Sequence, residues 1–111
     1  MKLTEIISQL GLKPLSDVHD TDVTGAYASD LLSDVVGNAK VGNLLITIQV
    51  HRNVVAVAGL VSLAAVIVTN GRTPENDVLT VARENGVVLL STTDSAFTVA
   101  GRLYALGLRS A

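Results

Sequence analysis

The sequence predicts an α/β fold: a single domain, residues 1–111, with a mainly parallel sheet of about four or five strands flanked by helices. Short apolar runs alternate along the chain with segments that carry helix caps and stop signals, as in repeated strand–helix units. Most of these runs are apolar throughout, which suits parallel strands that are covered on both faces. The length fits one domain and allows a core that needs no disulfide or metal.

The N-terminal part of the chain is expected to begin with a short helix. Thr4 can cap this helix, and Gly11 can end it. Lys13 and Pro14 then break the chain, and residues 17–22 form an acidic, turn-rich stretch. The regular alternation of strands and helices starts only after this stretch.

The first strand and helix of the alternation follow directly. Residues 23–28 are predicted as a strand. Ser29 and Asp30 are placed to cap a helix that runs through Val36, and Gly37 ends it.

The second strand and helix contain the most ambiguous segment of the chain. Residues 44–50, LLITIQV, form a strong strand. The valines of residues 53–60 also favour a strand, and periodicity does not separate the two structures in a short apolar run. We predict a helix capped at Asn53, because the segment lies between two better strands and parallel neighbours need a crossover.

The third and fourth strands surround a helix that opens with proline. Residues 64–69, AAVIVT, are predicted as a buried strand, and residues 87–90 as the fourth strand. Between them, Pro74 is expected at the first helical position, where its missing N–H costs nothing. This helix ends near Gly86.

The final helix is capped by Asp94 or Ser95, runs to Leu106, and is ended by Gly107. Four of its residues follow the i, i+3, i+4, i+7 rule and are expected to face the sheet: Phe97, Ala100, Leu103 and Tyr104.

Composition and charge exclude several classes of protein. The net charge is −2, without the basic footprint of a domain that binds nucleic acid. The chain has no cysteine, so a reducing, cytoplasmic compartment is expected. No signal peptide is visible at its start. Residues 54–68 resemble a membrane span in length, but Gly59, Ser62 and several alanines lower their hydrophobicity, so no membrane association is predicted.

The shortage of charge predicts self-association. Hydrophobic residues make up 49% of the chain and charged residues only 16%, against about 25% charged in a typical domain. A small domain has too much surface to hide this apolar sequence inside one copy. We therefore expect a homodimer or a higher homo-oligomer. The alternative is that the apolar surface binds a different protein.

Motifs for catalysis, metals and cofactors are absent. The chain has no Walker loop, GxGxxG, GxSxG, HExxH or CxxC motif. His51 could contact an anion or act as a base, but a lone histidine after a strand more often makes a loop hydrogen bond. His19 lies among Asp17, Asp20 and Asp22 in a spacing that fits no metal motif, so we expect a solvated turn. We predict no catalytic residue, metal site or cofactor, and no enzyme activity.

A parallel sheet would gather polar side chains at the ends of its strands, where open α/β sheets bind ligands. Arg52 and Arg72 could clamp a phosphate or carboxylate there, beside the unpaired N–H groups of helix N-termini. The alternative is that the polar residues are only helix caps and turn formers. Arg52 distinguishes the two: internal pairing indicates a structural role, and an open cleft indicates a ligand. The candidate ligand-binding residues are Arg52, Thr69, Asn70, Gly71, Arg72, Thr92 and Ser95.

Three segments together resemble the DRTGG domain family, particularly its small stand-alone members. They are VTGAYASDLLSDVVGNAKVGNLLITIQVHRNVVAVA, AAVIVTNGRTPENDVLTVARENGVVLLSTTDSAF and TVAGRLYALG. The resemblance covers about residues 18–107. The family is related in fold to the N-terminal domain of HPr kinase and also occurs as an insert between CBS domains in some inorganic pyrophosphatases, so the resemblance implies the same α/β fold.

Single positions carry part of the resemblance. The family's arginine after the second strand is matched by Arg52, and its threonine and final glycine after the third strand by Thr69 and Gly71. Asn70 stands where the other glycine is usual, and asparagine can still adopt a positive φ. His51 replaces an acidic residue that often precedes the arginine.

The resemblance implies a regulatory or assembly domain, often at a dimer interface, with no catalysis of its own. Stand-alone members are often encoded near iron-hydrogenase components, which implies a link to the regulation of redox enzymes. The alternative function is a small-molecule sensor that binds a nucleotide or another anion at the strand ends.

Overall fold

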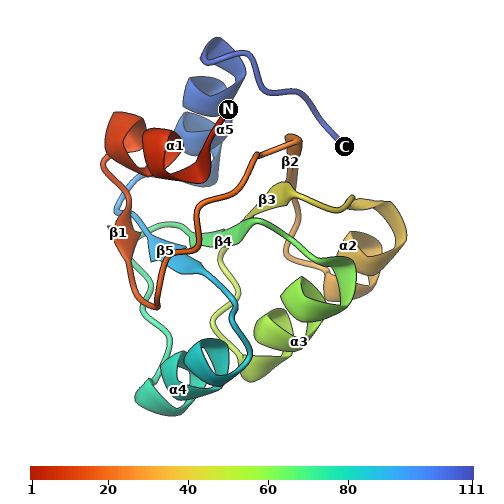
Figure 1. Cartoon of the computed structure of the whole chain (residues 1–111), viewed down its shortest axis with the longest axis vertical. Coiled ribbons are helices and arrows are strands. Elements are labelled where there is room, and N and C mark those ends of the chain that lie inside the picture. Colours follow the sequence, from red (N-terminus) through yellow and green to blue (C-terminus); the bar gives the residue numbers. More distant parts are fainter.

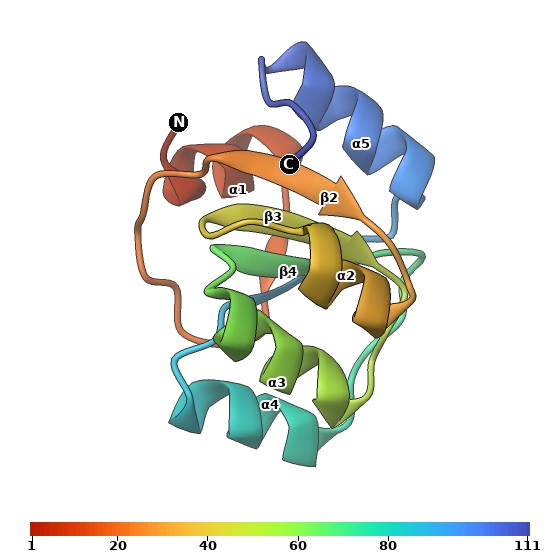
Figure 2. The same ribbon diagram turned by 90° about the vertical axis from the view of Figure 1, so that its right-hand side faces the viewer.

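The computed structural model describes residues 1–111 and shows one five-stranded sheet between two layers of helices (Figures 1 and 2). The strands are β1 (Lys13–Pro14), β2 (Gly25–Ala28), β3 (Asn43–Thr47), β4 (Ala65–Val68) and β5 (Leu89–Ser91). The helices are α1 (Leu3–Leu10), α2 (Leu32–Asn38), α3 (Arg52–Val61), α4 (Asn76–Glu84) and α5 (Ala96–Ala105). The predicted α/β fold with a mainly parallel sheet is confirmed.

The strand order β1-β5-β4-β3-β2 places successive parallel strands side by side. Crossovers between parallel strands are right-handed, so adding each strand on the same side keeps the connecting helices on one face. Figure 2 shows α2, α3 and α4 on that face and α1 and α5 on the other. The chain therefore leaves β4 toward one face of the sheet and leaves β5 toward the opposite face.

Two hydrophobic cores explain why the strands are apolar throughout. Leu44 packs with α1 and α5, whereas its neighbour Leu45 packs with the residues of α2, α3 and α4. Leu90 and Leu89 divide between the two cores in the same way. All four side chains are fully buried, because successive side chains of a strand point to opposite faces and both faces are covered here.

The N-terminal break in the chain proves to be a fifth strand. Lys13 pairs with Ser91 and Pro14 with Leu90, so β1 runs antiparallel to β5 at one edge of the sheet. A proline fits here because an edge strand can point its N–H position away from the ladder. Two residues are too few for any period, so the sequence pattern does not predict this strand.

The ambiguous apolar segment is the helix α3, as predicted, but its predicted cap is wrong. The N-cap is His51, whose Nδ1 accepts a hydrogen bond from the Asn53 backbone N–H at 3.1 Å. Asn53 lies inside the first turn. Ser62, in the left-handed conformation with φ 62°, ends the helix before β4. No helix of the structure combines the length and the hydrophobicity needed to cross a bilayer.

Two further predicted caps are wrong, because one residue lies inside its helix and the other bonds to β3 instead. Thr4 lies within α1, and its N–H donates to Oδ1 of Asp20 at 3.2 Å. Asp30 does not cap α2, whose N-cap is Leu31. Its carboxylate instead accepts the Thr47 hydroxyl and the Ile48 N–H, each at 2.9 Å, which ends the β3 ladder earlier than predicted.

The opening of α4 also differs from the prediction. Its N-cap is Glu75, so Pro74 lies one position before the cap rather than at the first helical position. Pro74 is buried there. Of the predicted N-caps, only that of α5 is confirmed, because the Ser95 hydroxyl accepts the Thr98 N–H at 3.2 Å.

The predicted sheet-facing side of α5 is right for Leu103 and Ala100, which pack in the core between the sheet, α1 and α5, and wrong for the two aromatic residues. Phe97 is 88% exposed and Tyr104 is 62% exposed, whereas Val99 and Leu103 are only 1% exposed. The helix offers two apolar stripes that both satisfy the helical spacing, and the stripe with small, branched side chains packs on the sheet. The aromatic stripe is left at the surface.

Candidate functional site

The carboxyl ends of the four parallel strands meet at one end of the sheet, and the predicted site residues all lie in or beside the loops there. The structure does not bring them together as one site. Instead it separates them into a surface ion pair, a set of residues with structural roles, and a polar crevice.

Arg52 forms the ion pair. Its Nη2 lies 3.2 Å from Oδ2 of Asp77, and the two side chains are 55% and 58% exposed. The pair links the start of α3 to the start of α4 and contributes at most about 1 kcal/mol at such exposure. Glu75 lines the adjoining cavity of about 310 Å³ together with Asp77. Two carboxylates beside one guanidinium make this position unfavourable for an anion.

Thr69 has a structural role. Its side chain is fully buried, and its N–H and hydroxyl both reach the carbonyl oxygen of Thr47, at 3.0 and 3.5 Å. These bonds hold the end of β4 against the end of β3. A fully buried hydroxyl does not contact a ligand at the surface.

Asn70 and Gly71 form a turn in which both residues have positive φ, 63° and 68°. The prediction that asparagine can replace the usual glycine in this conformation is confirmed. The Asn70 N–H donates to the carbonyl of Asp94 at 2.9 Å, and the Gly71 N–H donates to that of Thr92 at 3.0 Å. The turn therefore binds the loop after β4 firmly to the loop after β5.

A polar crevice of about 330 Å³ opens beside this turn, and Gly71, Arg72 and Thr92 of the predicted set line it. The sequence prediction missed the wall formed by Gly11 and Lys13, because it comes from the end of α1 and from the unpredicted strand β1. The lining residues are Gly11, Lys13, Gly71, Arg72, Thr73, Ser91, Thr92 and Thr93.

A hydrogen bond between two residues outside the predicted set shifts the pKa values of both. The Tyr27 hydroxyl donates to Oδ2 of Asp34 at 2.8 Å and ties β2 to α2. The hydrogen bond to Asp34, followed by burial, raises the pKa of Tyr27. The bond from Tyr27, followed by bonds from Ser29 and Asn38, lowers the pKa of Asp34. The pair is structural, and no motif in the sequence marks it.

The acidic stretch around His19 does not assemble into a metal site. No group of three His, Cys, Asp or Glu side chains comes together anywhere in the structure.

A search of the curated proteins finds no match to this sequence. Among solved structures, the chain is similar to the CBS and DRTGG domains of the regulatory region of a Clostridium perfringens pyrophosphatase, crystallised with the activator diadenosine tetraphosphate. The TM-score is 0.69 at 18% sequence identity, which shows a shared fold. The similarity covers 96% of this chain and 47% of the other, so this chain spans about half the length of that regulatory region.

The DRTGG domain family matches residues 15–106, which is most of the chain. The match contains β2 to β5 with their helices, whereas α1 and β1 precede it. By sequence and by fold, this chain belongs to the DRTGG domain family.

Proposed function

We propose that this chain is a non-catalytic regulatory domain that acts by pairing with a second copy of itself. The observation that carries the proposal is a largely apolar surface formed by the edge strand β2 and the neighbouring side of α5, which we call the β2–α5 face. It consists of Ala26, Ala28, Phe97, Ala100, Gly101 and Tyr104.

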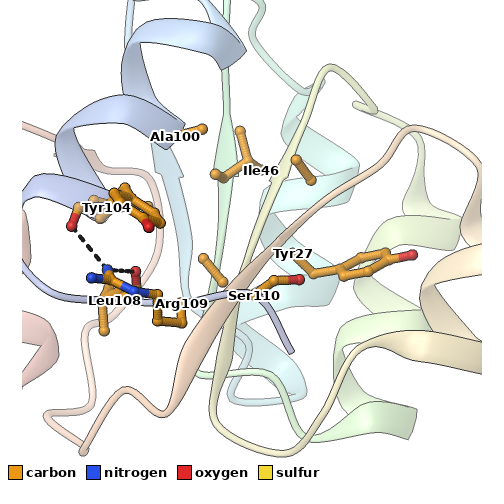
Figure 3. Close-up of a pocket in the computed structure, with 10 residues that line it drawn as sticks. Tyr27, Ile46, Ala100, Tyr104, Leu108, Arg109 and Ser110 are labelled. Atoms are coloured by element: carbon orange, nitrogen blue, oxygen red, sulfur yellow. Dashed lines mark hydrogen bonds between the residues drawn. The ribbon is translucent and has the colours of Figure 1, made fainter.

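The α5 part of this face is an exposed aromatic stripe. Phe97 and Tyr104 lie two helical turns apart on the same side, with Gly101 between them. Nothing lies within 4 Å of the position that a Cβ of Gly101 would take, so another chain could approach the helix closely. Below the stripe, a cavity of about 340 Å³ is lined largely by apolar residues of α5, β2 and the C-terminal segment (Figure 3).

The β2 part of the face is a sheet edge that the C-terminal segment covers only in part, through a β-bridge between Ala26 and Ser110. Lys13 and Pro14 form the opposite edge, and both residue types discourage strand pairing. At β2, the carbonyl of Arg109 covers the Ala26 N–H at 2.9 Å, but no segment covers Ala28, which is exposed. Backbone groups two residues apart on a strand point the same way, so Ala28 offers its backbone to a partner strand.

A second copy is the occupant that fits this face. Two-fold pairing brings the same surface of both chains together, and a largely apolar surface suits such pairing. The nearby Arg109 guanidinium is already engaged, because it stacks over the Tyr104 ring at 3.9 Å and donates to the carbonyls of Tyr104 and Leu108. Phe97 and Tyr104 expose roughly 300 Å² together. This is a substantial part of the roughly 800 Å² per partner in a stable interface.

The similar solved structure supports the regulatory part of the proposal, since it is the regulatory region of an enzyme. The link to redox enzymes and the cytoplasmic location stay predictions.

The proposal is tested by the solution mass over a wide dilution range, measured by light scattering or sedimentation. We expect twice the 11.5 kDa of one chain for the unchanged protein and a single-chain mass for Phe97→Asp. Leu60→Asp is the matched control, because Leu60 is 73% exposed on α3, away from the face. A single-chain mass for the unchanged protein would refute self-association. If Leu60→Asp dissociates the dimer and Phe97→Asp does not, self-association stands but the β2–α5 face is not the interface.

A second candidate function is the sensing of a nucleotide or another anion. The similar pyrophosphatase region binds a nucleotide activator, and this chain has a basic, polar crevice at the carboxyl end of its sheet. A ligand that binds the folded state raises the melting temperature by mass action. Adenine and guanine nucleotides are therefore expected to raise it, and an unmoved melting curve would contradict sensing.

A further inference from the structure

We propose that the crevice between the loops that follow β4 and β5 binds the phosphate group of a small molecule through Lys13 and Arg72. The proposal rests on the sensing function and names its site and its ligand class. The crevice lies where the chain leaves β4 toward α4 on one face and leaves β5 toward α5 on the other. Adjacent strands whose connections diverge in this way form the usual ligand crevice of open α/β sheets.

The charges in the crevice favour an anion. The ion pairs of the structure are Lys2–Asp22, Arg52–Asp77 and Arg102–Asp94, so neither Lys13 nor Arg72 has a carboxylate partner. None of the lining residues is acidic. A planar guanidinium and an ammonium group together match the charge and the oxygen geometry of a phosphate.

Hydroxyl groups supply further donors. Thr73, Ser91 and Thr93 line the crevice, and their hydroxyls make no hydrogen bond within the chain. Thr92 differs, because its hydroxyl accepts the Asp94 N–H at 3.1 Å and so shapes the loop. The free hydroxyls can donate to phosphate oxygens without breaking any existing bond.

The walls of the crevice are held in place before a ligand arrives. Lys13 lies directly opposite Ser91 in the β1–β5 pair. Arg72 follows the turn in which the Asn70 and Gly71 N–H groups bind the carbonyls of the β5 loop. Fixed backbones reduce the ordering cost of binding.

The lining also limits what is recognised. No hydrophobic residue lines the crevice, so it offers no surface on which a nucleobase could stack. The crevice is therefore expected to bind the phosphate group of a nucleotide and not to discriminate between bases. Lys13 and Gly11 precede the part of the chain that matches the family, so one wall of this site is built by residues outside that match.

The test titrates the full chain with inorganic pyrophosphate, ADP, GDP and adenosine, with binding measured by calorimetry and by NMR shifts of backbone amides. We expect pyrophosphate, ADP and GDP to bind with similar affinity, with shifts at Gly71, Thr92 and Thr93, and adenosine not to bind. Binding of ADP but not of GDP or pyrophosphate would overturn recognition of the phosphate. No binding of any probe would overturn both this site and the sensing function.

Variants then locate the site. Lys13→Gln and Arg72→Gln are each expected to weaken binding of pyrophosphate about tenfold or more, because each removes a charged hydrogen-bonding partner. Arg52→Gln is the control, since Arg52 is an exposed arginine at the same end of the sheet that already pairs with Asp77. Loss of binding in Arg52→Gln with retention in the other two would overturn the crevice and leave sensing intact.

Discussion

Single side chains in this protein act mostly as ties between segments that are distant in sequence. Asp30 holds the end of β3, Thr69 holds β4 against β3, and Ser16 joins the N-terminal segment to the sheet. The Ser16 hydroxyl donates to the Val87 carbonyl at 2.7 Å and accepts the Leu89 N–H at 2.9 Å. Buried polar groups need such partners, and no buried side-chain polar atom here lacks one.

The tie between Tyr27 and Asp34 predicts a pH dependence of stability. The pKa of Asp34 is lowered in the folded state, so its contribution is present above the ordinary carboxyl pKa near 3.8 and is lost as the pH falls through the lowered value. The pKa of Tyr27 is raised, so its contribution is lost only as the pH rises beyond the usual 10.0. Tyr27→Phe removes the bond.

We therefore expect Tyr27→Phe to melt at a lower temperature than the unchanged protein at pH 7, with a difference that shrinks below about pH 4. Melting curves of both proteins across pH 2–8 check this. A difference that is the same at pH 2.5 and pH 7 would mean that the lost hydroxyl acts through packing rather than through the carboxylate.

At the scale of elements, the caps show which local signals survive in the fold. Ser95 caps α5 as its sequence position predicts, whereas α3 is capped by His51, a residue type outside the usual set. His51 is the last residue of the loop that connects β3 to α3. The path of this loop therefore decides which residue lies at the N-cap position of α3.

This difference predicts opposite outcomes for two adjacent substitutions. His51→Ala should cost about 1 kcal/mol of unfolding free energy, because the Asn53 N–H loses its acceptor. Asn53→Ala should be close to neutral, because the Asn53 side chain makes no hydrogen bond within the chain. Urea unfolding of both variants measures the two changes in unfolding free energy. A larger decrease in Asn53→Ala than in His51→Ala would show that Asn53 is the N-cap after all.

At the scale of the whole molecule, one face of the sheet is covered only by helices inside the family match, whereas the other face is also covered by α1, which lies outside it. The family match supplies α2, α3 and α4 on one face and α5 on the other. The remaining cover is α1, whose residues Leu3, Ile6 and Leu10 are buried in the core of that second face. The hydrophobic core of the domain therefore needs α1.

Removal of residues 1–14 is expected to abolish cooperative folding, although the family match begins at residue 15. Each of the buried side chains of α1 contributes roughly 1.5–3 kcal/mol, and a domain of this size has a total stability of roughly 5–15 kcal/mol. Circular dichroism melts of the truncated chain check the loss. A sharp transition at the original temperature would show that α1 is dispensable.

How much of this protein follows from its sequence depends on the range of the interactions involved. Apolar runs and turn residues predicted the α/β class and the four parallel strands, because these signals act within a few residues, and the need for a crossover between parallel strands then predicted α3. The positive φ of Asn70 was predictable for the same reason.

Long-range contacts decided the rest. β1 exists because β5 offers it a partner, and the exposed side of α5 was decided by which of two equivalent stripes met the sheet. The candidate site shows the same division. The strand-end residues were visible in the sequence, but the tertiary structure paired Arg52 with Asp77, buried Thr69 and brought Lys13 to Arg72. A one-dimensional pattern does not report such pairings, because they depend on where the completed sheet places each loop.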